Sequence, residues 1–98
     1  MRLTKNEIKA IKNSYFKVFK SGDIYLFGSR VDESKRGGDI DLYIVPNQDI
    51  SSLELLEKKL DFLVELKTLI GDQKIDLVIA RDKNRLIEQE ALQKGIKL

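Results

Sequence analysis

Two aspartates, separated by one residue at the start of an apolar segment, constrain the folding of this 98-residue chain more than any other feature. The segment reads DIDLYIV, residues 39–45, and it follows a polar loop that opens with Gly-Ser-Arg. Side chains alternate between the two faces of a β-strand. We therefore expect the intervening apolar residues to share one face, whereas Asp39 and Asp41 share the other face with Tyr43. Such a strand offers one face to a core and one face to charged chemistry.

A later segment repeats this pattern with a single aspartate. Residues 74–80 read KIDLVIA, in which Asp76 and Val78 face away from the other apolar residues. A long helix is expected between the two strands, and such a right-handed crossover makes them parallel neighbours. Since the aspartates lie near the starts of their strands, parallel pairing brings Asp39, Asp41 and Asp76 to the same end of the sheet.

The convergence of three carboxylates predicts a metal site. Asp39 and Asp41 lie roughly 6.5–7 Å apart along the strand, so both carboxylates can reach one cation. We expect no Lys or Arg between the carboxylates, and their repulsion then favours a divalent cation. The chain has no histidine and no cysteine, so the ligands must be oxygens, which suit Mg²⁺ or Mn²⁺. The alternative interpretation is that each aspartate is an ordinary exposed strand residue.

The loop before the Asp-x-Asp segment has the residue types that bind phosphate. Gly28 allows the backbone to come close to a ligand, and Ser29 offers both a hydroxyl and a backbone N–H. Arg30 is able to pair with phosphate oxygens. Lys35 and Arg36 are further candidates whose roles the sequence leaves open. A Gly-Ser pair alone is typical of ordinary turns, so this prediction depends on its combination with the aspartates.

Apolar periodicity and capping residues predict alternating helices and strands. Thr4 and Glu7 have the spacing of a capping box, Ser51 or Ser52 is placed to cap a long helix, and Asp82 to cap the last one. We expect helices at residues 5–19, 52–70 and 83–93, and strands at residues 24–27, 39–45, 74–80 and 96–98. The predicted fold is α+β with two layers, a small mixed sheet and the helices that cover it, as one domain over residues 1–98.

The long helix carries apolar residues on two opposite sides. One side holds Leu53, Leu56, Leu60, Leu63, Val64 and Ile70, and the other holds Leu55, Phe62, Leu66 and Leu69. One side should pack on the sheet, and we expect the side of Leu55 and Phe62 to be the spare one. The spare side either packs on another helix or forms a protein interface.

Composition narrows the possible partners and the location. Lys and Arg total 18 and Asp and Glu total 16, and a net charge of +2 does not favour nucleic acid as a direct partner. No apolar run approaches the length of a membrane span. The first residues carry frequent charges, unlike a signal peptide. We therefore expect a cytoplasmic location.

These motifs together resemble the nucleotidyltransferases of the DNA polymerase β superfamily, and most closely the minimal nucleotidyltransferase (MNT) branch. In that family an apolar strand ends in Gly-Ser, the next strand contains Asp-x-Asp, and a later strand carries a third acidic residue. Here the corresponding segments are LFGSR, GGDIDLYIV and KIDLV, and the closing EQEALQKGIKL is also similar. The spacer between Ser29 and Asp39 is one residue shorter than in many members, and Gly38 stands where serine is frequent.

The resemblance implies a metal-dependent reaction. It implies that Asp39 and Asp41 bind two Mg²⁺ (or Mn²⁺) ions, and that Asp76 binds the catalytic metal and helps to activate the acceptor hydroxyl. Gly28 and Ser29 would hold the β- and γ-phosphates of a nucleoside triphosphate, expected to be ATP. The acceptor oxygen would attack the α-phosphate in line, and pyrophosphate would leave.

The resemblance also implies a class of partner. MNT proteins are often paired with HEPN-domain proteins in toxin–antitoxin modules, where some transfer AMP to a tyrosine of the toxin. We expect the catalytic core to use all of the chain, so the acceptor would come from another chain or sit on an open surface. The resemblance implies a HEPN-type partner protein, and association between copies is also open. Two alternatives remain: a non-catalytic module that sequesters its partner, and a transferase for a small molecule or an RNA end. The complete set of three aspartates favours an enzyme.

Overall fold

A computed structural model describes residues 1–34, 38–47 and 49–98. The predictions for Lys35 and Arg36 lie outside these described residues. The elements are α1 (Lys5–Phe19), β1 (Asp23–Phe27), the 3₁₀ helix η1 (Gly28–Val31), β2 (Ile40–Val45), α2 (Ser52–Ile70), β3 (Ile75–Ile79), α3 (Leu86–Lys94) and β4 (Ile96–Lys97). In the part of the chain so described, no helix combines the length and the apolar character that crossing a membrane would take.

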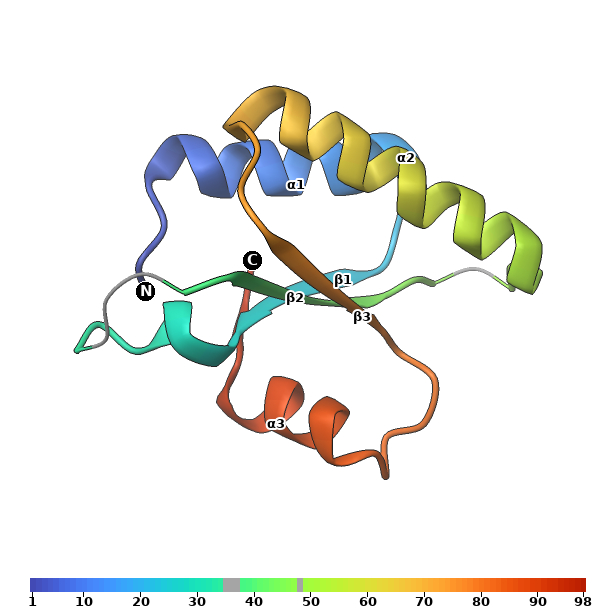
Figure 1. Cartoon of the computed structure of the whole chain (residues 1–98). Helices are drawn as coiled ribbons and strands as arrows, with labels where there is room; N and C mark the ends of the chain where they lie inside the picture. Colours follow the sequence, from blue (N-terminus) through green and yellow to red (C-terminus); the bar gives the residue numbers. More distant parts are fainter. Residues whose placement is uncertain (35–37, 48) are drawn as a thin grey trace.

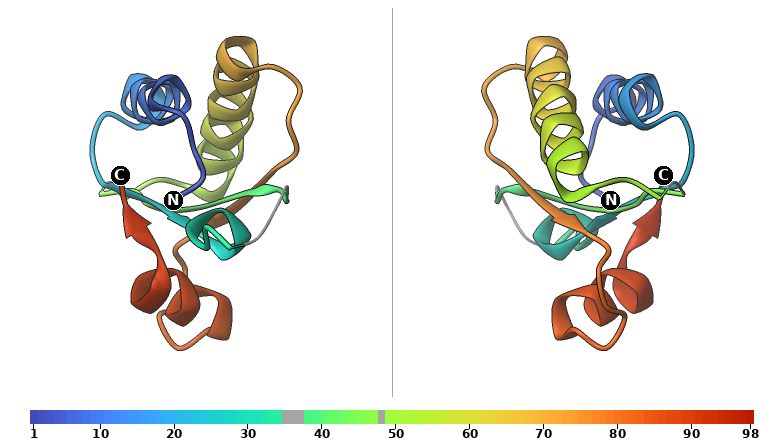
Figure 2. Two further views of the ribbon diagram at one scale, coloured as in Figure 1. Left: turned by 90° about the vertical axis from the view of Figure 1, so that its left-hand side faces the viewer. Right: turned by 90° about the vertical axis from the view of Figure 1, so that its right-hand side faces the viewer.

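The strands form one mixed sheet in the order β3-β2-β1-β4. β1 runs antiparallel to β2 and to β4, whereas β2 and β3 are parallel neighbours. Figures 1 and 2 show α1 and α2 side by side over one face of this sheet and α3 over the other. The predicted α+β class, the mixed sheet and the parallel pairing around the long helix are therefore confirmed, and α3 adds a third layer to the two that were predicted.

The main core lies between the sheet and the layer of α1 and α2. The alternating residues Ile40, Leu42 and Ile44 of β2 are fully buried on this face. Tyr43 points to the opposite face, where it forms a smaller cluster with Phe27 and with residues of α3. The two clusters fix the orientation of β2, because a shift of one residue would exchange its two faces.

Two of the predicted helix starts are confirmed by their hydrogen bonds. The Thr4 hydroxyl accepts from the backbone N–H of Glu7 at 3.0 Å, and the Glu7 carboxylate accepts from the backbone N–H of Thr4 at 2.9 Å. The Ser51 hydroxyl accepts from the backbone N–H of Glu54 at 3.2 Å and begins α2. Such caps satisfy N–H groups that have no partner within the helix.

The predicted start of the last helix was wrong. α3 begins at Leu86, and Asp82 instead accepts a hydrogen bond from the backbone N–H of Asn84 at 2.9 Å. The reason is Glu88, whose buried carboxylate accepts from the backbone N–H groups of Arg81 and Asp82 at 3.1 and 2.8 Å. This capture holds residues 81–85 outside the helix.

The assignment of the spare side of α2 was also wrong. Phe62 is fully buried, and its ring packs edge-on against Tyr15 and Phe19 of α1 at centroid distances of 6.0 and 6.3 Å. The opposite side faces outward, and its large apolar side chains are 52–68% exposed. We call this side the outer stripe, and it consists of Leu53, Leu56, Leu60 and Val64.

Candidate active site

The three aspartates lie at one end of the sheet, as the strand pattern predicts. Asp41 and Asp76 are register partners in the parallel pair of β2 and β3. Asp39 directly precedes β2. Asp41 lies two positions before Tyr43, so its side chain belongs to the face of the sheet that α3 covers. The carboxylates are thus separated from the main core by the sheet itself.

The carboxylates are close enough to affect one another's ionisation. Partial burial raises the pKa of Asp41, and the charges of Asp76 and Asp39 raise it further. Glu90, on α3, adds a smaller contribution in the same direction. Repulsion of this kind is relieved when a cation binds between the groups.

A lysine lies beside the aspartates, so the expectation of no basic residue there was wrong. Lys74 Nζ is 3.3 Å from Asp39 Oδ2. The placement follows from the backbone, because the carbonyl of Lys74 accepts from the N–H of Ile40 at 3.1 Å. The hydrogen bond and the charge of Asp39 raise the pKa of Lys74, and Asp76 and Asp41 contribute further. Both side chains of the ion pair are well exposed, so the pair is weak and easily exchanged.

The donor set suits a hard divalent cation, since all of its ligands are carboxylate oxygens. In this conformation, however, no three acidic side chains of the described residues are grouped closely enough to hold a metal ion. Asp39 pairs with Lys74 instead of joining Asp41 and Asp76. The residues therefore fit a metal chemically, and Asp39 would have to exchange Lys74 for it.

The Gly-Ser loop lies directly against the aspartates. β1 ends at Phe27, and Gly28 continues the chain with a φ of +74°, which favours glycine. A Cβ atom at Gly28 would also collide with the carboxylate of Asp41. A Cβ atom at Gly38, whose φ is +92°, would collide with the hydroxyl of Ser29. These two contacts set the loop backbone and the Ser29 side chain beside the Asp-x-Asp strand.

Arg30 is positioned differently from the prediction of a phosphate contact. Its guanidinium donates to the carbonyls of Gly38 and Arg2, at 3.2 and 2.9 Å, and to Gln73 Oε1 at 3.4 Å. Arg2 completes the arrangement by donating to the carbonyl of Ser29 at 2.8 Å. Each arginine thus donates to a backbone carbonyl of the loop, Arg30 to that of Gly38 and Arg2 to that of Ser29. The role of Arg2 had no local signal in the sequence, because its partners lie about 30 residues further along the chain.

A pocket of about 420 Å³ opens between this loop and α3. It is lined by Gly28, Ser29, Val31, Asp32, Glu90 and Lys94. Glu90 and Lys94 lie one turn apart on α3, so they share a side of that helix. The pocket therefore continues the carboxylate end of the sheet toward α3, most of which lies in the closing segment EQEALQKGIKL and to which the sequence assigned no site residue.

The arrangement of a Gly-Ser loop against an Asp-x-Asp strand, with a third aspartate in register, agrees with a comparison of the sequence with known families. The profile described as "Polymerase beta, Nucleotidyltransferase" matches residues 6–98. The chain belongs to this nucleotidyltransferase family. A comparison with curated proteins gave no match.

Solved structures that are similar to this nucleotidyltransferase include two of toxin–antitoxin proteins. One is a mutant of the toxin–antitoxin pair MntA–HpeT, at a TM-score of 0.65 and 24% identity, covering 94% of this chain and 70% of that one. The other is a tri-AMPylated HEPN toxin of Shewanella oneidensis in complex with an MNT antitoxin, at a TM-score of 0.60 and 25% identity. It covers 94% of this chain and 67% of that one. The likeness agrees with the predicted MNT resemblance.

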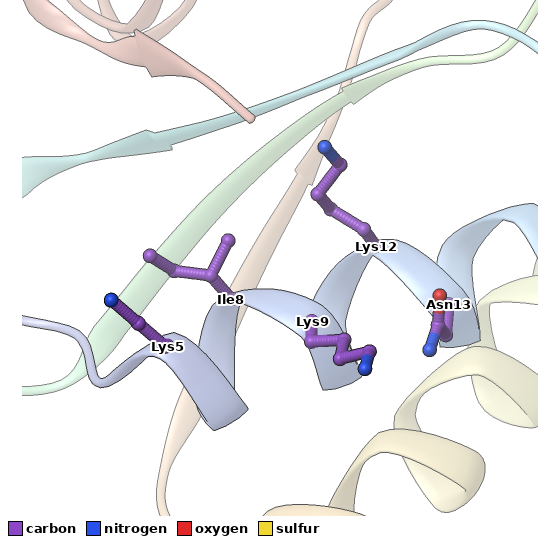
Figure 3. Close-up of a pocket in the computed structure, with 5 residues that line it drawn as sticks. All are labelled: Lys5, Ile8, Lys9, Lys12 and Asn13. Atoms are coloured by element: carbon purple, nitrogen blue, oxygen red, sulfur yellow. The ribbon is translucent and has the colours of Figure 1, made fainter.

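The nucleotidyltransferase has a second hollow, which lies apart from the aspartates. It measures about 320 Å³ and is lined by residues of α1, namely Lys5, Ile8, Lys9, Lys12 and Asn13 (Figure 3). α1 lies over the face of the sheet opposite α3. This hollow therefore takes no part in the candidate active site.

Proposed function

We propose that this nucleotidyltransferase transfers AMP from ATP to a hydroxyl group of a partner protein, as the antitoxin of a HEPN/MNT-type module. The observation that carries the proposal is the register of Asp41 with Asp76 beside the Gly28 turn. This arrangement places carboxylates and a phosphate-approaching backbone at one end of the sheet. The similar structure that contains a tri-AMPylated HEPN toxin supports the choice of AMP and of a protein acceptor.

In the proposed reaction the acceptor oxygen forms a bond to the α-phosphorus, and the bond to the bridging oxygen of pyrophosphate breaks. Asp76, exposed near the start of β3, accepts the proton of the acceptor hydroxyl. Gly28 and Ser29 orient the β- and γ-phosphates through backbone and hydroxyl groups. Bound by Asp39, Asp41 and Asp76, Mg²⁺ or Mn²⁺ would neutralise the charge that develops on the phosphate oxygens.

The outer stripe of α2 supplies a surface for the partner. It is apolar and exposed, and acidic side chains such as Glu57 and Asp61 border it. We propose that the acceptor protein docks here through an apolar face with a basic edge. The proposal places the protein in the cytoplasm, the compartment that supplies ATP.

One observation favours a non-catalytic module that binds and sequesters its partner. The ion pair of Asp39 with Lys74 leaves the aspartates without a closed metal site in this conformation. A module of this kind would use the outer stripe and would not need the aspartates.

Incubation with labelled ATP, Mg²⁺ and the product of the neighbouring gene tests the proposal. We expect the partner to be labelled and pyrophosphate to be released. Asp76→Asn should abolish the labelling while the complex persists, because Asp76 is in register with Asp41 on the face of the sheet that α3 covers, whereas α2 lies over the opposite face. A wild-type protein that binds the partner but labels nothing with any nucleoside triphosphate would support sequestration instead.

A further inference from the structure

We propose that Lys94, at the end of α3, binds the β- and γ-phosphates of the nucleotide from the side opposite the Gly-Ser loop. The inference rests on the proposed function and adds a residue outside the Gly-Ser, Asp-x-Asp and third-aspartate motifs. Lys94 lines the pocket of about 420 Å³ together with Gly28 and Ser29. A triphosphate held by the loop would thus lie within the same pocket as the ammonium group.

Lys94 is the basic residue that this pocket has available. Of the residues that the structure describes, it is the only Lys or Arg in the pocket lining. It also makes no ion pair with any of those residues. Arg30, the residue that the sequence suggested for this task, directs its guanidinium to Gly38, Arg2 and Gln73. Among the described residues of this lining, the ammonium group of Lys94 is therefore the cation that could pair with a triphosphate.

The position of Lys94 is held by rigid elements on both sides. Ala91, one turn earlier, is fully buried against the cluster of Phe27 and Tyr43. Two residues later, Ile96 is the register partner of Leu26 in the antiparallel pair of β4 and β1. The backbone of Lys94 is thus fixed beside the end of β1, from which the Gly-Ser loop departs. A binding group on rigid elements loses little conformational freedom when its ligand arrives.

The charges along α3 also indicate which end of the triphosphate would lie near the aspartates and which near Lys94. Glu90 is near enough to Asp41 to act on it electrostatically, and Lys94 follows one turn later on the same side of α3. The α-phosphate would lie at the carboxylate end, where the cations bind, and the β- and γ-phosphates at the ammonium end. This order points the pyrophosphate leaving group toward Lys94.

Calorimetric binding of ATP and of AMP, in the presence of Mg²⁺, tests this role. Lys94→Met should weaken ATP binding by roughly tenfold, since it removes a charge-assisted contact to phosphate. AMP, which lacks the β- and γ-phosphates, should bind the variant and the wild type alike. Lys94→Arg should retain most of the ATP affinity. Lys83→Met is the matched control, because Lys83 is exposed and precedes the opposite end of α3.

The outcomes separate this inference from the proposed function. Equal ATP affinity in Lys94→Met and in the wild type would overturn the role of Lys94 and leave the proposed function standing. Equal losses for ATP and AMP, with a lowered melting temperature, would show a structural role instead. A wild-type protein that binds no ATP would overturn both.

Discussion

The ion pair between Lys74 and Asp39 is the contact that a cation would have to replace in the candidate site. Lys74 supplies one positive charge where the metal would supply two, so it partly offsets the repulsion among the carboxylates. An exposed pair of this kind contributes about 0–1 kcal/mol to stability. A divalent cation that binds all three aspartates should therefore displace Lys74 from Asp39 at little cost.

The first prediction concerns this metal. Mg²⁺ or Mn²⁺ should raise the melting temperature, and at a concentration of about 100 times Kd it should add about 2.7 kcal/mol to the free energy of unfolding. The double change Asp39→Asn and Asp41→Asn should abolish the effect and raise the metal-free melting temperature, because it removes repulsion around Asp41. Thermal unfolding with and without metal measures both. Asp49→Asn, in the β2–α2 connection, is the control, and a double variant that still responds to metal would place the site elsewhere.

The second prediction concerns Ser29. Ser29→Ala should weaken ATP binding by roughly tenfold, because a hydroxyl that contacts a charged phosphate is lost. The free energy of unfolding should change by no more than about 0.5 kcal/mol, since Arg2 is bonded to the carbonyl of Ser29, which alanine retains. Calorimetry and urea unfolding give the two numbers. A large loss of stability at unchanged ATP affinity would mean that Ser29 serves only the turn.

At the scale of helices and strands, the sequence predicted what local patterns determine. The apolar alternation of β2 and the capping box at Thr4 were readable, because each depends on residues a few positions apart. The start of α3 was not, because it depends on the tertiary capture of backbone N–H groups by Glu88. Which side of α2 faces the core could also not be predicted, because both sides are apolar. The packing of Phe62 on α1 determines it.

The third prediction concerns the outer stripe of α2. Leu56→Asp with Val64→Asp should break the complex with the partner while the protein remains folded, because these side chains are 52% and 67% exposed. Phe62→Asp should instead unfold the protein, since truncation of a buried Phe alone costs about 3–5 kcal/mol. Size-exclusion chromatography with the partner, and thermal unfolding of each variant, distinguish the two sides.

The same chromatography of the protein alone detects association between copies. A larger mass that the double variant reduces would assign the outer stripe to a second copy of the chain. A complex with the partner that survives the double variant would contradict docking at this stripe.

At the scale of the whole molecule, Glu88 connects the α3 side of the sheet to the loop before that helix. Its carboxylate accepts from the Tyr43 hydroxyl at 2.8 Å and from Arg85 at 3.2 Å, besides the two backbone N–H groups already described. Burial alone would raise the pKa of Glu88, but the hydrogen bonds from Asp82, Tyr43 and Arg81 lower it overall. A buried carboxylate with this many donors holds together the segments that supply them. The sequence does not single out Glu88, because it is one of several acidic residues near the end of the chain.

The fourth prediction follows from the sign of this shift. The pKa is lower in the folded state, so the stabilisation is present above the ordinary value near 4.5 and is lost as pH falls through the folded value. Glu88→Gln should therefore lower the free energy of unfolding by about 1.5–3 kcal/mol at pH 7, because an amide oxygen is a weaker acceptor than a carboxylate for these donors. The difference from the wild type should shrink as the pH falls below 4.5. Urea unfolding over this range measures it, and a difference that does not vary with pH would argue against an ionised Glu88.

Because Gly28 lies against the carboxylate of Asp41, the residue types that each of these two positions accepts depend on the other. Any side chain at position 28 competes for space with the carboxylate at position 41, so a gene that keeps Asp41 has no room to change Gly28. A gene that replaces Asp41 by a shorter residue removes the collision with the carboxylate oxygen, and the φ of +74° remains, which asparagine also tolerates. Related sequences that lose the activity should therefore change first at position 41 and only afterwards at position 28. A non-glycine residue at position 28 would therefore mark a copy in which Asp41 was lost first.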